Sequence, residues 1–417
     1  MRWIVLVLFA LAAGVVAADR GGIPFRPEVK VFEPGQKALI AFNGEEEVLY
    51  LSTDLRASAK TKVVELVPFP SKPKVSEADE GVLQRVQRWL WPHYVKWWGA
   101  KRAVEDGAHF GRGNGVVVLE HKRIGAHNIS ILKATEADEL IAWIEKKVGK
   151  EVYAKARYRQ RLETVAKHYI ACSFHYFAFD EVDLEAETRS VEPLEYRFKT
   201  PFPYYPLVIS SLMEGETTIT LGIFVPDLAP FIKTMPKGFE DVLEKANGKA
   251  GASSLTLMAV QLEALWKSGA SLFERSASVE FCVYRYKGKV KFENDIPELD
   301  GARKRGKKMA ETLIAMGRQA LEAGDEELAA TILADVSRFE WCAEEAMKKA
   351  SGMLEGVKAK PTAAPESTVC AYWRALGYAV CGMNEAAVKS MRGVSARKMP
   401  EVWMKKITTL ITKLKEL

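Results

Sequence analysis

The sequence is poor in side-chain amides, since asparagine and glutamine occur only 6 times each in 417 residues. Lysine, arginine and glutamate are abundant by contrast, and charged residues make up 27% of the chain. Depletion of thermolabile amides together with enrichment of charge is the trend of hyperthermophile proteins. The composition therefore predicts a thermophilic source and says nothing about function.

Cysteine is also scarce, and its spacing gives no disulfide framework. The chain has five cysteines, an odd number, so at least one thiol is unpaired in a monomer: Cys172, Cys282, Cys342, Cys370 and Cys381. The segment between Cys370 and Cys381 is expected to be a helix, which would hold the two about 16 Å apart. A disulfide needs Cα atoms within roughly 7 Å. We therefore expect no bond between these two.

Long apolar runs are absent except at the N-terminus. Arg2 precedes an uncharged apolar segment, residues 3–16, which is followed by Ala17 and Ala18. This order of a basic, an apolar and a small-residue region is that of a secretory signal peptide. A spanning helix needs roughly 20 apolar residues, so a membrane anchor is the less favoured alternative. We expect cleavage after Ala18, or second after Ala17, and a secreted or extracytoplasmic, soluble mature chain without a transmembrane anchor.

Charge is unevenly distributed along the mature chain. Residues 301–417 carry 20 Lys and Arg against 14 Asp and Glu, a net charge of +6, whereas residues 19–300 have a net charge of −1. Nucleic-acid binding needs a concentrated basic face. In helices rich in both lysine and glutamate, the charged side chains usually only face solvent. We therefore expect no nucleic-acid partner.

Hydrophobic patterning divides the mature chain into two regions. Residues 19–300 contain many short β-branched runs broken by Gly, Asn and Pro, which is typical of strands. Few helices interrupt them, and residues 134–149 form the clearest one. After residue 300 the pattern is helical throughout. The predicted fold is α+β: residues 1–18 are a signal peptide, residues 19–300 a mixed or antiparallel β-rich domain with packed helices, and residues 301–417 an all-α region.

The helical region has small residues at the offsets of a tetratricopeptide-type helix pair, among them Gly317, Ala320 and Gly324. A second such group includes Gly377, which stands 60 residues after Gly317. That separation is not a multiple of the repeat length of about 34 residues. An irregular helical bundle is therefore favoured, and a tetratricopeptide-like arrangement is the alternative.

Candidate metal ligands are few. His121 and His127 flank a predicted turn, and His168 and His175 flank a predicted strand. Two such pairs with a carboxylate could bind a metal ion. However, the sequence has no His-Glu-x-x-His motif, and neither spacing places two histidines on one helix face. Isolated histidines are favoured, the metal ligands stay unknown, and no cofactor is expected.

Other chemical motifs are weak. The glycine-rich segment 111–115 precedes a strand, so it is expected to be a turn and not a phosphate-binding loop, which opens a helix. An acidic run could bind calcium but lacks the glycine-containing loop spacing, so a solvated loop is favoured for Asp180, Asp183, Glu185 and Glu187. There is no Gly-x-Ser-x-Gly motif. The sequence therefore names no catalytic residue and favours a protein that is not an enzyme.

Two surface features leave alternatives open. Asn128 begins an Asn-Ile-Ser tripeptide that fits an N-glycosylation acceptor, although a strand there would make it inaccessible. The segment from Trp89 to Trp98 holds four tryptophans, which could form a sugar-stacking or membrane-interface surface. Its helical spacing favours a core position instead.

Several stretches resemble an uncharacterised, secreted domain family of bacteria and archaea. VELVPFPSKPKV (residues 64–75) is similar to its proline-rich segment, and NISILKATEADELIAWIEKKVG (residues 128–149) to its strand-helix segment. YYPLVISSL (residues 204–212) resembles a later strand. The likeness covers roughly residues 20–290. It implies secretion and brings no activity, because the family has no assigned function.

Three functions stay open. A non-catalytic extracytoplasmic binding or envelope-associated protein is favoured, since no acid-base set is visible. A secreted hydrolase with a carboxylate or metal site scattered along the chain is the first alternative. The second is a structural protein that docks an envelope protein partner through its C-terminal helices.

N-terminal sequencing of the protein from its host tests the export prediction. We expect the mature chain to start at Asp19, or at Ala18 if cleavage follows Ala17. An intact Met1 in the membrane fraction would contradict a secreted, soluble product.

Overall fold

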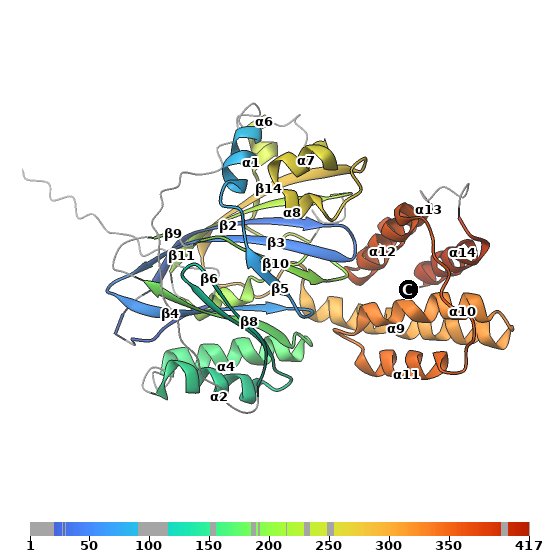
Figure 1. The fold of residues 1–417 in the computed structure, drawn as a ribbon, viewed down its shortest axis with the longest axis horizontal. Helices are drawn as coiled ribbons and strands as arrows, with labels where there is room; N and C mark the ends of the chain where they lie inside the picture. Colours follow the sequence, from blue (N-terminus) through green and yellow to red (C-terminus); the bar gives the residue numbers. More distant parts are fainter. Residues whose placement is uncertain are drawn as a thin grey trace, which may run out of the picture.

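The computed structural model describes residues 21–26, 28–29, 31–90, 116–150, 156–184, 189–190, 192–213, 215–228, 234–247, 254–392 and 399–416. The expected signal peptide, the glycine-rich segment 111–115 and the Trp-rich segment beyond Leu90 lie outside the described residues. Figure 1 shows two stacked sheets with helices on both sides, and a separate group of helices beside them. The α+β prediction with a helical C-terminal region is confirmed.

The larger sheet has nine strands and is mixed. Its order is β12-β14-β11-β2-β3-β10-β5, with β13 paired to β14 and β9 to β3. All described pairs are antiparallel except β11 with β2, which is parallel. The strands are β2 (Val31–Phe42), β3 (Glu46–Ala57), β5 (Lys74–Glu77), β9 (Arg189–Ser190), β10 (Leu194–Lys199), β11 (Glu216–Val225), β12 (Glu240–Asp241), β13 (Leu255–Met258) and β14 (Ser278–Lys289).

The smaller sheet has five antiparallel strands in the order β1-β4-β8-β7-β6. They are β1 (Gly21–Pro24), β4 (Thr61–Phe69), β6 (Val117–Ile124), β7 (His127–Lys133) and β8 (Tyr176–Leu184). Strand β4 is buried on both faces, which explains why its sequence is an almost continuous apolar run and not an alternating one.

Helices cover the outer face of each sheet (Figure 1). Helices α2 (Ala137–Val148) and α4 (Ala156–Ala171) pack on the smaller sheet, where the rings of Trp143 and Phe179 meet at 4.7 Å. On the larger sheet, the ring of Trp266 stands edge-on to Tyr50 at 6.3 Å. The covering helices there are α1 (Val82–Leu90), α6 (Val242–Asn247), α7 (Ala259–Leu265) and α8 (Lys267–Ala270).

The C-terminal region folds into a helical bundle. Its elements are α9 (Leu299–Glu322), α10 (Glu326–Leu333), the 3-10 helix η3 (Ala334–Phe339), α11 (Glu344–Leu354), α12 (Glu366–Val380), α13 (Asn384–Arg392) and α14 (Glu401–Glu416). Gly317 lets α9 and α10 pack closely, because a Cβ there would lie 2.6 Å from the side chain of Leu333. Gly324 ends α9 with φ +77°, a conformation that favours glycine. The small-residue pattern therefore reflects tight helix pairing.

The bundle docks directly on the sheets. Trp341, which follows η3, packs edge-on against Phe202 at 5.3 Å and Phe174 at 6.3 Å. On α12, a Cβ at Gly377 would overlap the carbonyl oxygen of Pro201. One body of buried apolar side chains includes residues of both sheets and of the bundle. The boundary near residue 300 stays a prediction, but the two parts share a buried apolar interface.

A buried carboxylate anchors the segment that leads from the sheets into the bundle. Asp295 accepts hydrogen bonds from the hydroxyls of Tyr169 (3.0 Å) and Tyr204 (3.1 Å). It also accepts from the backbone N–H groups of Leu207 and Val208, both at 2.7 Å, at the start of the 3-10 helix η2 (Val208–Leu212). Burial raises the pKa of Asp295 from 3.8 to about 6, against these hydrogen bonds, which lower it.

Asp295 should make the protein less stable as pH rises from about 4 to about 6. In this window the unfolded carboxyl is already ionised while the buried one still holds its proton, so folding binds protons. The change should be on the order of 3 kcal/mol. Asp295→Asn, which cannot ionise, should flatten this part of the profile. Denaturant unfolding of both proteins at several pH values checks it, and an unchanged slope would contradict it.

Gly377→Ala should destabilise the protein by about 1–3 kcal/mol, because the added methyl group collides with rigid backbone. Gly352→Ala is the matched control: Gly352 lies in α11 with nothing within 4 Å of a Cβ there. That change should be neutral or stabilise by up to ~1 kcal/mol. Urea unfolding of the two variants compares them, and equal effects would show that α12 can shift away from Pro201.

Candidate ligand-binding cleft

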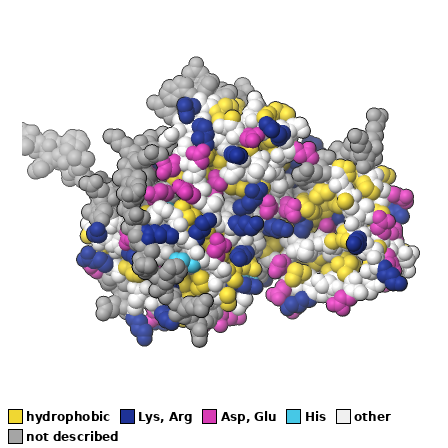
Figure 2. Space-filling view, in the orientation of Figure 1, with side chains coloured by type: hydrophobic (Ala, Val, Ile, Leu, Met, Phe, Trp, Pro, Cys, Tyr) yellow, Lys and Arg dark blue, Asp and Glu magenta, His cyan; other side chains and the backbone are white. Residues whose placement is uncertain are grey.

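A cleft of about 570 Å³ lies where the sheets meet the helical bundle. Figure 2 shows Lys and Arg side chains gathered across the middle of this face. The cleft is formed by the β2–β3 turn, the segment between β4 and β5, the end of β10, η3 and α12. Its charged and aromatic lining residues are Glu45, Glu46, Lys72, Lys74, Lys133, His175, Tyr176, Arg197, Phe198, Lys199, Asp335, Arg338, Glu340, Trp341, Glu344 and Trp373.

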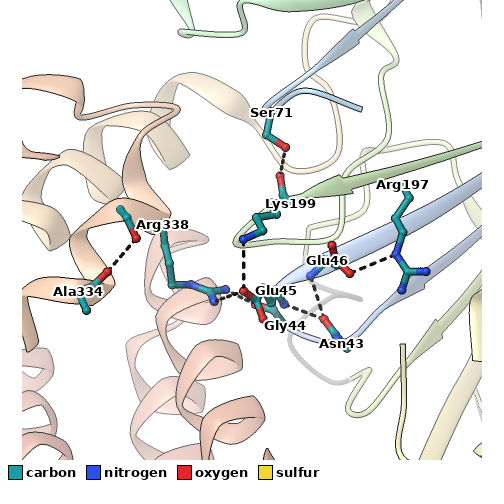
Figure 3. Close-up of polar contacts among 10 residues, drawn as sticks. Asn43, Gly44, Glu45, Glu46, Ser71, Arg197, Lys199, Ala334 and Arg338 are labelled. Carbon is teal, nitrogen blue, oxygen red and sulfur yellow. Dashed lines mark hydrogen bonds and ion pairs between the residues drawn. The ribbon is translucent and has the colours of Figure 1, made fainter. Parts of the chain in front are cut away.

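The turn between β2 and β3 places two carboxylates at the cleft (Figure 3). Gly44 has φ +107°, and the Asn43 side-chain oxygen accepts the N–H groups of Glu45 and Glu46, both at 2.9 Å. An Asn-Gly pair is a strong hairpin-turn signal because both residues tolerate positive φ. The local sequence therefore fixes the direction in which Glu45 and Glu46 project.

The helical bundle supplies a cationic side chain that binds this turn. Arg338 of η3 donates to the Gly44 carbonyl at 2.7 Å and lies 3.7 Å from Glu45. Its guanidinium carbon stacks 3.8 Å from the ring centroid of Trp373 on α12. Stacking and hydrogen bonding together hold the planar guanidinium in one orientation. Arg338 thus sets the distance between the two walls of the cleft.

Most of the acidic groups at the cleft are already matched by cations. Lys199 lies 4.0 Å from Glu45, and Arg197 lies 3.1 Å from Glu46. Asp335 pairs at 2.6 Å with Lys406, a buried lysine that also lies between the rings of Tyr372 and Trp403. Glu344 pairs with Lys348 at 2.9 Å, which lowers the pKa of Glu344.

Three lysines at the cleft form no ion pair with any residue that the structure describes: Lys72, Lys74 and Lys133. Lys72 and Lys74 are exposed, and Lys133 lies over the ring of Tyr176 at 5.6 Å. The lining has six Lys and Arg against five Asp and Glu, and Asp335 and Glu344 also pair with cations outside it, so these ammonium groups give the cleft a net positive charge. Such a charge is suited to an anionic ligand.

The polar groups at the cleft do not form a nucleophile-base pair within the described chain. Ser71 donates to the carbonyl of Lys199, and Ser337 to that of Ala334. Burial, and then Lys133, lower the pKa of His175, so its imidazole is neutral at pH 7. The arrangement can bind and orient a charged molecule.

The predicted histidine pairs are not brought together as ligand pairs. His121 and His127 lie three register positions apart on the β6–β7 ladder and so face opposite sides of the sheet. His121 contacts the Ser130 hydroxyl at 3.1 Å, whereas His127 is buried against Asp180 at 2.5 Å. The strand predicted between His168 and His175 is wrong, because His168 lies in helix α4 and β8 begins only after His175. His168 stands edge-on to Tyr169, and burial lowers its pKa.

The acidic run is not the solvated loop that the sequence predicted. Asp180 and Asp183 lie within strand β8, where Asp180 is buried and Asp183 exposed. Pairing with β4 and β7 on both sides overrides the local polarity of the segment. Glu185 and Glu187 lie outside the described residues. The run therefore offers no calcium loop in the part of β8 that is described.

Asn128 lies within β7, between β6 and β8, and its N–H donates to Asp180 at 3.1 Å. This is the paired-strand setting in which a glycosylation acceptor is inaccessible. Trp89 is half-buried and packs against the core residue Phe281 at 5.3 Å, while Trp98 and the rest of that segment lie outside the described residues.

The described thiols are free: Cys172, Cys282, Cys342 and Cys381. Burial raises the pKa of Cys172 to about 12, and that of Cys381 to about 12 as well, so both are unreactive thiols. Helix α12 carries Cys370 and ends just before Cys381, as expected from the sequence.

The residues of the cleft were missed by sequence reasoning because they come from segments far apart in the chain. The Asn43-Gly44 turn was the one local signal.

Across the described chain, no helix combines the length and apolarity needed to cross a membrane.

Comparison with known proteins gives a family but no activity. A family model described as "Uncharacterized protein conserved in bacteria (DUF2330)" matches residues 15–227. No curated protein matches the chain. The crystal structure of baculovirus P35 is similar at 9% identity over 57% of this chain and 77% of that chain, with a TM-score of 0.32. Similarity of that degree carries no argument about fold or function.

Proposed function

The chain belongs to the DUF2330 family of uncharacterised proteins conserved in bacteria, and we propose that it is an exported, non-catalytic protein that binds an anionic ligand in the cleft. The observation that carries this proposal is the set of lysines without ion pairs, Lys72, Lys74 and Lys133, beside acids most of which pair with other cations. Carboxylate and phosphate groups are the anions that such ammonium groups bind.

The size and walls of the cleft fit a small charged molecule or the end of an acidic polymer. Its volume of about 570 Å³ lies in the usual range for ligand pockets, roughly 300–1,000 Å³. The Trp373 ring and the Arg338 guanidinium, which stack on each other, also line the cleft. A ligand there would touch both the sheets and the helical bundle, so binding would stabilise their docking.

Export and a thermophilic source complete the proposal. Residues 1–18 have the order of regions of a signal peptide, with cleavage after Ala18, and the low amide content fits a hot environment. An exported protein of this kind would act outside the cytoplasm, on a soluble anion or on an acidic component of the envelope. The serine hydroxyls of Ser71 and Ser337, which donate to backbone carbonyls, support a non-catalytic role.

Binding of pyrophosphate and citrate to the full mature chain tests this function, with neutral glucose as the negative probe. The triple variant Lys72→Ala, Lys74→Ala, Lys133→Ala should bind both anions about tenfold more weakly or worse, since each lost charge-assisted hydrogen bond is worth on the order of 1.5–3 kcal/mol when desolvated. Calorimetric titration at low and moderate salt measures the loss.

The matched control changes three exposed lysines on and after β14, Lys287, Lys289 and Lys291, to alanine, which removes the same total charge. It should bind within about twofold of the unchanged protein because these lysines do not line the cleft. Equal losses of affinity in the two triple variants would show that overall charge, and not the position of the cleft lysines, causes the effect. No binding of either anion to the unchanged protein would contradict the proposal.

A further inference from the structure

Three buried ionisable side chains converge on one face of the smaller sheet, away from the cleft. Glu65 on β4 lies directly opposite Asp180 on β8, and His127 projects from the neighbouring strand β7. Their relative exposures are 0%, 1% and 1% respectively. One ligand atom from each lies within 4.8 Å of the other two. Sequence separation hides this group, because its members come from three strands.

Strand alternation places the group between the two sheets. Glu65 shares its face of β4 with Val63, and Asp180 shares its face of β8 with Val182. Those two valines pack with Leu55 and Ala57 of the larger sheet. Like charges directly opposite on paired strands repel each other, and the repulsion grows in a low-dielectric interior. A cation between the two carboxylates would interact favourably with both.

The imidazole of His127 is held as a metal-binding histidine usually is. Its Nε2 lies 2.8 Å from the carbonyl oxygen of Glu192. A carbonyl only accepts, so Nε2 carries the hydrogen and donates it. Metal-ligating histidines commonly donate their second ring N–H to a backbone carbonyl in this way. The other nitrogen, Nδ1, faces the Asp180 carboxylate at 2.5 Å.

Asp180 is oriented by an outer contact as well. Its Oδ1 accepts the N–H of Asn128 at 3.1 Å, which leaves Oδ2 directed at His127. In a bound site, Oδ2 and Nδ1 would each lie about 2.0–2.2 Å from the ion, so they would move apart by about 1 Å. A set of one imidazole and two carboxylates suits a divalent transition metal better than calcium, which prefers oxygen alone, or copper(I), which prefers sulfur.

We propose that Glu65, His127 and Asp180 form a buried structural site for a zinc-class divalent cation. The ion would join β4, β7 and β8, the three central strands of the smaller sheet. Because the ligands are buried, the ion enters as the sheet forms and leaves only when it opens. The site is independent of the anion cleft and does not rest on the proposed binding function.

Metal content and melting temperature of the full chain test the site. Protein produced in zinc-supplemented medium should contain one equivalent of zinc by mass spectrometry, and loss of that zinc on prolonged chelation should lower the melting temperature by about 5 °C. Glu65→Gln keeps the side-chain shape but removes one charged ligand; it should contain less than half an equivalent and lose the response to chelation.

Glu181→Gln is the matched control. It makes the same chemical change one residue from Asp180, on the opposite face of β8, where Glu181 pairs with Lys62 at 3.4 Å. This variant should keep the full zinc content and the shift. If Glu65→Gln does not fold, cobalt(II) binding to the unchanged protein gives a second measurement. Cobalt bound at the site with a low coordination number should give an intense visible absorption spectrum, which should disappear when zinc displaces the cobalt.

The alternative to a metal site is that the three side chains share protons with one another and bind no ion. Unchanged protein without bound metal, melting equally with and without chelator, would overturn the proposal. So would equal zinc content in Glu65→Gln and Glu181→Gln, since the ion would then lie elsewhere.

Discussion

The buried carboxylate of Asp295 is the interaction on which the arrangement of the molecule depends. It accepts hydrogen bonds from Tyr169 on α4, from Tyr204 after β10 and from the start of η2, and α9 begins four residues later at Leu299. One side chain thus holds α4, η2 and the segment after β10 to the residues that lead into the first helix of the bundle. Removing any partner of a buried charge is costly, because the charge then stays unpaired.

The cleft follows from the position in which the Asp295 contacts hold the start of the bundle. With α9 fixed, η3 and α12 lie against the β2–β3 turn, and Arg338 can reach the Gly44 carbonyl while it stacks on Trp373. The walls are therefore built from two parts of the chain that share an apolar interface. The lysines that carry the proposed binding lie on the sheet side: Lys74 and Lys133 belong to strands β5 and β7, and Lys72 lies just before β5.

Local signals in the sequence predicted the elements well and the site poorly. Alternation and turn residues indicated most strands, and the helix expected at residues 134–149 is observed as Ala137–Val148. The strand expected at residues 204–212 is wrong, because this segment contains the 3-10 helix η2. The acidic run was misjudged because burial of Asp180 depends on the strands beside it and on a partner, His127, 53 residues away. Lys72, Lys133, Arg338 and Trp373 meet only through tertiary packing, and no periodicity or motif in one chain encodes such a meeting.

The parallel pairing of β2 with β11 at the centre of the larger sheet also affects when the sheet can form during synthesis. Ala38 of β2 lies opposite Leu221 of β11, so the partner strand is made roughly 180 residues later, about 10–40 s at the usual rates of synthesis. During that interval β2 has an open apolar edge, which invites wrong pairing. The export proposed above would require the chain to stay unfolded until it reaches the translocation machinery, and this topology delays the completion of its core.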